Sequence, residues 1–109
     1  MNSLSKKRCV PCEGGIPPLS LKKVKELLKE LNEWKAEKNK KLWKEFNFKN
    51  FVEAMHFANL VGEIAEKENH HPDLCISWGK VKVELSTHSI KGLSENDFIL
   101  ASKIDAIMH

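Results

Sequence analysis

The chain has 109 residues, a length that fits one ordinary domain and leaves no room for two. Apolar residues make up 41% of it and charged residues 30%, so it can bury a core and is not expected to be disordered throughout. Eighteen basic against fifteen acidic residues leave a net charge of only +3, less than a dedicated nucleic-acid binder usually carries.

No stretch approaches the roughly 18 apolar residues that span a bilayer. The basic start of the chain is not followed by the apolar run of a signal peptide. Three cysteines, one of them far from the others, do not make a disulfide framework. We therefore expect a cytoplasmic protein that binds neither a membrane nor nucleic acid directly. Cys9 and Cys12 form an isolated CxxC pair, a pattern of low specificity for a metal or redox role.

Residues 1–18 are predicted to be an N-terminal arm and residues 19–109 the folded domain. The arm ends in a Gly- and Pro-rich segment that cannot propagate a helix or a central strand. Ser20 is a plausible N-cap for a first helix, whose apolar residues recur at helical spacing up to Leu31. Residues 34–37 and 42–48 follow, and their alternation indicates an antiparallel hairpin.

A second helix is predicted from Asn50, because Glu53 three residues on completes a capping-box pattern. It ends at 69–73, after which residues 74–78 and 81–85 alternate around Gly79-Lys80 as a second hairpin. Ser94 with Asp97 opens a last helix. The order αββαββα predicts an α+β fold, in which three helices pack on one face of a four-stranded antiparallel sheet.

Three of the five histidines stand out by position. His70 and His71 lie in the break before the second hairpin, and His88 follows its last strand. His71 is eight residues before Gly79 and His88 is eight residues after Lys80, so the hairpin predicts that these two lie near each other. His56 and the terminal His109 are expected to be solvated.

Such a cluster permits acid–base chemistry, because imidazole exchanges a proton near neutral pH. A zinc site is the weaker alternative, since adjacent side chains on an extended backbone diverge and no HExxH helix is present. The three histidines could also have no joint role.

The surrounding residues resemble the pterin-4a-carbinolamine dehydratases, also known as dimerization cofactors. The pattern of that family is met by Glu66, the run His70-His71-Pro72, Trp78, His88 and Asp97, each at the family spacing. The resemblance covers about residues 19–107.

The resemblance implies a hydro-lyase that removes water from 4a-hydroxytetrahydropterin, the product of aromatic amino-acid hydroxylases, without a metal or redox cofactor. His70 and His88 are then the acid–base pair, and His71 binds and orients the pterin. The pterin ring is lined by Asn69 and by Ser86, Thr87, His88 and Ser89, while Glu66 and Asp97 support the histidines.

Trp78 is expected either to contact the pterin or to be a core aromatic, since it alternates with Leu74 and Ile76. The resemblance also implies a homo-oligomer, either a dimer or a tetramer. The rival hypothesis is an interaction module whose active site is vestigial, and the filled catalytic positions argue against it.

Overall fold

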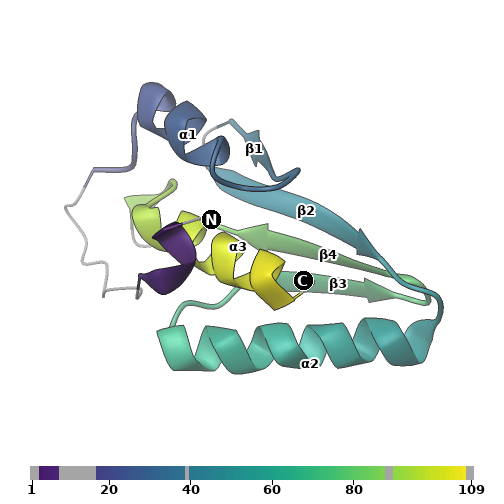
Figure 1. The fold of residues 1–109 in the computed structure, drawn as a ribbon. Helices are drawn as coiled ribbons and strands as arrows, with labels where there is room; N and C mark the ends of the chain where they lie inside the picture. Colours follow the sequence, from purple (N-terminus) through teal and green to yellow (C-terminus); the bar gives the residue numbers. More distant parts are fainter. Residues whose placement is uncertain (1–2, 8–16, 39, 88–89, 108–109) are drawn as a thin grey trace.

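The computed structural model describes residues 3–7, 17–38, 40–87 and 90–107. A short 3₁₀ helix, η1, precedes the αββαββα order predicted from the sequence (Figure 1). The elements are η1 (Ser3–Lys6), α1 (Leu21–Leu28), β1 (Lys35–Glu37), β2 (Lys41–Asn47), α2 (Phe51–Glu68), β3 (Asp73–Ser77), β4 (Lys80–Leu85) and α3 (Glu95–Ile107).

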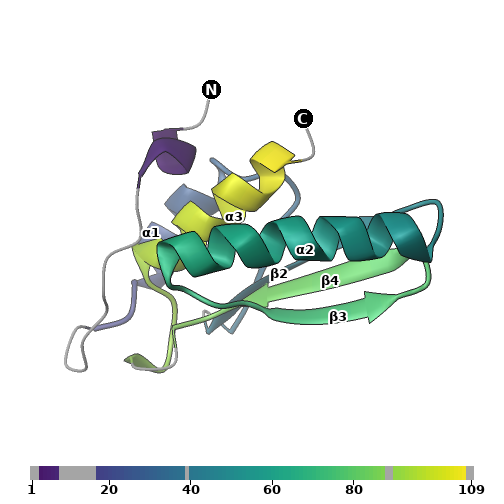
Figure 2. The ribbon, with the colours of Figure 1, turned by 90° about the horizontal axis from the view of Figure 1, so that it is seen from below.

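The four strands form one antiparallel sheet in the order β1-β2-β4-β3. Alternate residues of the two central strands face the helices, because successive side chains of a strand point to opposite faces. Figure 2 shows α2 and α3 on the same side of β3 and β4. The α+β class and its single helical layer are therefore confirmed. The buried core is formed by these strands and helices; it includes Leu42, Phe46, Val81, Val83, Leu85, Ala54, Phe57, Val61, Phe98 and Ala101.

The turn between β3 and β4 lies one residue earlier than predicted. Ser77 pairs with Lys80, so the turn is Trp78–Gly79 and Lys80 already belongs to β4. Gly79 permits a close approach to the end of β2, because a Cβ at this position would lie 2.9 Å from the carbonyl oxygen of Phe48. The shift moves both strands by one residue and keeps the same residues of β4 on the core face. Cys75 and Trp78 are exposed.

The N-caps predicted for the first two helices are both present. The side chain of Ser20 accepts a hydrogen bond from Lys23 N (3.2 Å), and that of Asn50 accepts one from Glu53 N (2.9 Å). The Glu53 carboxylate reaches back to Lys49 N (3.1 Å). These caps satisfy backbone donors that the first turn of a helix leaves without an internal partner.

The start of the chain contains a short helix that the sequence analysis did not predict. Residues 3–6 form η1, which packs on α3 (Figure 1). Leu4 is only 1% exposed and belongs to the hydrophobic core. The sequence gives little sign of this contact, because a single leucine among polar residues shows no periodicity. Cys9 and Cys12 lie outside the described residues.

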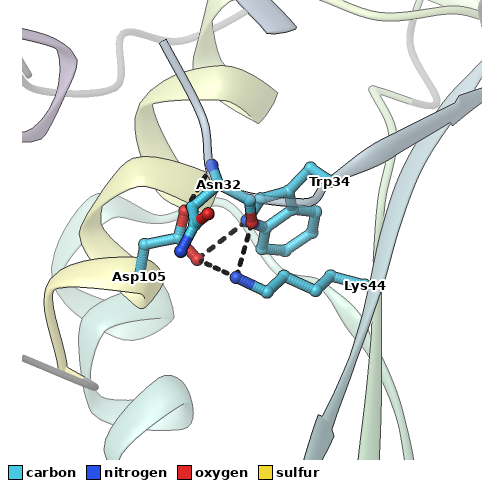
Figure 3. Close-up of polar contacts among 4 residues, drawn as sticks. All are labelled: Asn32, Trp34, Lys44 and Asp105. Atoms are coloured by element: carbon cyan, nitrogen blue, oxygen red, sulfur yellow. Dashed lines mark hydrogen bonds and ion pairs between the residues drawn. The ribbon is translucent and has the colours of Figure 1, made fainter. Parts of the chain in front are cut away.

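A charged contact joins β2 of the sheet to α3 (Figure 3). Lys44 lies between Leu42 and Phe46 on the core-facing side of β2, where a lone ammonium would be costly. Its Nζ lies 2.8 Å from Asp105 Oδ1 of α3 and donates to the carbonyl oxygen of Asn32 (2.6 Å). Asp105 also accepts from Trp34 Nε1 (3.0 Å), so one carboxylate connects three segments.

None of the helices in the described part of the chain is long and apolar enough to cross a membrane.

Candidate active site

The junction of α2 and β3 brings His70 to the first turn of α3. His70 Nε2 lies 2.6 Å from Asp97 Oδ1, although 27 residues separate them in the sequence. The histidine side chain is mostly buried and the Asp97 side chain is fully buried. A carboxylate only accepts hydrogen bonds, so Nε2 is the protonated nitrogen and Nδ1 is the nitrogen outside this contact.

Asp97 is fixed by two further groups. Its Oδ2 accepts from the Thr87 hydroxyl (2.8 Å) and from Ser94 N (3.0 Å). Because the Thr87 proton is engaged by Asp97, Ser94 Oγ donates to Thr87 Oγ1 (2.8 Å). The capping box predicted for α3 consists of two hydrogen bonds. The bond from Ser94 N to the Asp97 carboxylate is one of them. The buried carboxylate thus caps α3 and holds His70 at the same time.

Asn69 sets the direction in which the chain leaves α2. It has φ 52° and ψ 42°, the left-handed conformation that Gly and Asn adopt most readily after a helix. His70 N donates to Ala65 O (3.2 Å) and Asn69 N to Glu66 O (3.3 Å), the paired bonds of a Schellman motif. This backbone turn carries His70 toward α3, whereas the Asn69 side chain is exposed.

His71 lies beside Glu66 on the surface. Its Nε2 is 2.5 Å from Glu66 Oε2, and the two side chains are 57% and 77% exposed. The pair lines a shallow groove of about 820 Å³ along α2, with Pro72 and Leu74 at the β3 side. Exposure leaves His71 free to contact a ligand, while Glu66 limits the orientations of its ring.

The register corrects the prediction of which positions face each other across the hairpin. The ladder pairs Asp73 with Glu84, whereas the predicted turn would have placed Asp73 opposite Ser86, and β3 begins at Asp73. The closeness of His71 and His88 stays a prediction. His88 and Ser89 lie outside the described residues.

Trp78 is separated from His70 and His71 within one chain. It occupies the β3–β4 turn, 69% exposed, at the end of the hairpin away from the α2–β3 junction (Figure 1). The five residues of β3 between these ends span about 16 Å. Trp78 is thus neither a core aromatic nor a neighbour of the histidines in its own chain.

A second concave surface, the lysine cleft, lies on the other side of Thr87. Its volume is about 450 Å³. It is lined by Glu37, Lys38, Lys40 and Lys41 at the β1–β2 turn, and by Ser86, Thr87, Lys91 and Gly92 after β4. Ser86 and Thr87 therefore border a concave surface of the size that small ligands occupy.

The charged groups of the lysine cleft include one compensated cation. Lys41 Nζ lies 3.2 Å from Glu37 and 3.3 Å from Glu84, and hydrogen bonds to these two carboxylates raise its pKa. Burial alone would raise the pKa of Glu84, but hydrogen bonds from Lys41 and Lys82 outweigh it and hold that pKa below its ordinary value. These lysines were not among the residues predicted for the site. The run 38–41 has the composition of an ordinary polar turn, so its sequence gives no sign of a cleft.

In the described ranges, no three His, Cys, Asp or Glu side chains come together as a metal site requires. The geometry instead gives a mostly buried imidazole oriented by a fully buried carboxylate. Such an imidazole can exchange a proton through its other nitrogen. His71 and Thr87, which lie next to this imidazole in sequence or in its hydrogen-bond network, each line a concave surface, and the arrangement is suited to acid–base chemistry on a small molecule.

Comparison with known proteins finds similar sequences and a similar structure. The family described as "Pterin 4 alpha carbinolamine dehydratase" matches residues 17–107. Proteins named as pterin-4-alpha-carbinolamine dehydratases are 52% identical in Alkaliphilus metalliredigens over 96% of both chains, and 55% identical in Rickettsia canadensis over 97% of this chain and 98% of that one. A crystal structure titled as a transcriptional coactivator/pterin dehydratase from Brucella melitensis superposes with a TM-score of 0.78 at 33% identity, covering 84% of this chain and 98% of that chain.

Proposed function

The chain belongs to the pterin 4 alpha carbinolamine dehydratase family, and we propose on this premise that it dehydrates 4a-hydroxytetrahydropterin to the quinonoid dihydropterin. In this reaction the C4a–O bond breaks, the N5–H proton is removed, and a C4a=N5 double bond and water form. The product is the form that a reductase returns to the tetrahydropterin used by aromatic amino-acid hydroxylases.

The observation that carries the mechanism is the contact between His70 and Asp97. The departing hydroxyl needs a proton and N5 must lose one, and histidine can serve either need near neutral pH. Asp97 holds the His70 ring through Nε2, so Nδ1 is the nitrogen that exchanges the proton. The buried position of Asp97 keeps this orientation fixed through the reaction.

We assign the second proton transfer to His88, which follows Thr87 in the sequence. His71 is assigned to binding, because it is exposed and lies beside Glu66 at the edge of the groove. Ser86, Ser89 and Asn69 are proposed to contact the ring through hydrogen bonds. Thr87 acts mainly through Asp97, since its hydroxyl already donates to that carboxylate.

The proposed mechanism uses no metal or redox cofactor. Loss of water changes no oxidation state, so no redox cofactor is needed. The Nε2 atoms of His70 and His71 each contact a carboxylate and do not face each other. We expect full activity after treatment with a chelator. Loss of activity on chelation, restored by zinc, would contradict this part of the proposal.

A homo-oligomer explains how Trp78 could reach a pterin. β3 is an edge strand, so its outer backbone groups can pair with a second chain. Antiparallel pairing of two β3 strands about Cys75 would set Trp78 of one chain opposite Pro72 of the other, next to the partner's histidines. The exposed Phe51 and Val52 of α2 offer a further contact surface.

The proposal is tested by following loss of the 4a-hydroxypterin absorbance with purified protein. Because 4a-carbinolamines also lose water spontaneously, the catalysed rate is measured against a protein-free control. His70→Ala with His88→Ala should lower kcat by more than the product of the single changes, because each histidine can partly replace the other. A double variant with wild-type kinetics and a native circular dichroism spectrum would favour the interaction-module hypothesis.

A further inference from the structure

The lysine cleft has a charge that dehydration of a neutral pterin does not require. Four lysines and one glutamate line it, in a chain whose net charge is only +3. Its volume of about 450 Å³ lies within the range of small-molecule sites. The cleft therefore concentrates positive charge around a cavity rather than on an open surface.

Three of these lysines have no anionic partner in the described part of the chain. Lys41 is neutralised by Glu37 and Glu84, as described above. Among the residues that the structure describes, no carboxylate pairs with Lys38, Lys40 or Lys91. Their ammonium groups are available to a ligand.

Two of the unpaired lysines have an unusual backbone conformation. Lys38 has φ 51° and Lys91 has φ 54°, in the left-handed region that favours Gly, Asn or Asp. Lysine at such a position is less favourable than Asn or Gly. Its presence at two turns that line one cleft is consistent with a function for the side chains.

The cleft borders the catalytic network through a single residue. Thr87 lines the cleft, and its hydroxyl donates to the carboxylate of Asp97 that holds His70. A pterin ring placed against His70 can thus direct its substituent past Thr87 and toward the lysines. The substituent at C6 is the part of a pterin that differs between natural members of the class.

We propose that the lysine cleft binds an anionic group at the end of the C6 substituent of the pterin substrate. The inference rests on the proposed dehydratase function and names its substrate class. Lysine ammonium groups bind phosphate and carboxylate as point charges through charge-assisted hydrogen bonds. A phosphate monoester and a glutamate side chain share this chemistry, and the experiment distinguishes them.

The test compares three stable 7,8-dihydropterins that share the ring and differ at C6. One carries a neutral hydroxylated side chain, the second the same side chain with a terminal phosphate monoester, and the third a side chain that ends in glutamate. Dissociation constants are measured by fluorescence at about 0.01 M and about 1 M salt, where the Debye lengths are about 30 Å and 3 Å. We expect at least one anionic compound to bind about tenfold more tightly than the neutral one at low salt, and this advantage to shrink at high salt.

The cleft variant combines Lys38→Asn, Lys40→Gln and Lys91→Asn, with asparagine chosen where the backbone is left-handed. The matched control combines Lys22→Gln, Lys23→Gln and Lys25→Gln on the exposed face of α1 and removes the same charge. In the cleft variant the dissociation constants of anionic and neutral compounds should become equal. The control should keep the wild-type ratio.

Equal binding of all three compounds to the wild-type protein would overturn the anionic subsite and leave the dehydratase proposal intact, provided that the neutral carbinolamine is dehydrated. An equal loss in the cleft variant and in the control would also overturn it, because the effect would then belong to overall charge. If the wild-type protein neither binds a pterin nor dehydrates the neutral carbinolamine, the proposed function fails and this inference fails with it.

Discussion

The carboxylate of Asp97 contacts His70 through Oδ1 and the start of its own helix through Oδ2. The first contact, at 2.6 Å, orients a candidate catalytic imidazole, and the second caps α3 at Ser94. The contact with Ser94 is buried and the contact with His70 is partly buried, so both are largely shielded from solvent. The stability of one helix and the geometry of the site therefore depend on one side chain.

Asp97→Asn should lower kcat about 10²-fold, because the amide cannot accept from His70, Thr87 and Ser94 as the carboxylate does. A role in helix capping alone would lower the thermal midpoint and leave kcat unchanged at temperatures well below that midpoint. Glu95→Gln, an exposed change in the same turn, is the control and should leave kcat unaltered.

His71→Ala should raise KM more than it lowers kcat, because His71 is exposed and assigned to binding. Glu66→Gln should have the same effect to a smaller degree, since it removes the orienting contact and keeps the imidazole. Steady-state kinetics of the two variants and of Glu45→Gln, an exposed control on β2, measure the split. A fall in kcat at unchanged KM would place His71 in proton transfer.

Asn69→Gly and Asn69→Ala separate the backbone role of this position from its side-chain role. Glycine accepts the left-handed conformation, whereas alanine is expected to destabilise the fold by about 1 kcal/mol. If the Asn69 amide contacts the pterin, both variants should show a higher KM, while only Asn69→Ala should unfold at lower denaturant. An unchanged KM in the glycine variant would remove the side chain from the binding site.

Leu4→Ala should destabilise the protein by about 2–3 kcal/mol, near the low end of large-to-small core changes, because η1 is short and can partly relax. Urea denaturation measures the change. Lys7→Ala, which removes the exposed contact to Glu95, is the control and should cost less than about 1 kcal/mol. A Leu4 variant as stable as the wild type would show that η1 does not contribute to the core in solution.

Asp105→Asn should cost about 2–3 kcal/mol, since it leaves the ammonium of Lys44 without its carboxylate on the core side of β2. Replacing both partners, as Lys44→Met with Asp105→Leu, should recover part of this loss because no charge then remains unpaired. Chemical denaturation of the single and double variants gives the coupling. A single variant within about 0.5 kcal/mol of the wild type would show that the network in Figure 3 does not stabilise the packing of α3.

Local patterns in the sequence were sufficient for the architecture. Helical spacing, the caps at Ser20 and Asn50 and the alternation of β2 and β4 depend on neighbouring residues, so each element could be predicted from its own segment. The two hairpins then left few ways to build an antiparallel sheet. The motif around His70 and His71 identified the family for the same reason, because its spacing is a property of the chain alone.

Contacts between distant segments were decided by the tertiary structure. The turn at Trp78–Gly79 fixes the register of the β3–β4 hairpin. A shift of one residue on each strand keeps the same apolar residues on the core face. The alternation of apolar residues therefore could not exclude the wrong register. The burial of Leu4 and the partnership of Lys44 with Asp105 depend on elements that meet only after folding. The lysine cleft likewise joins two turns separated by about half of the chain, and no local pattern shows which charges will share a cavity.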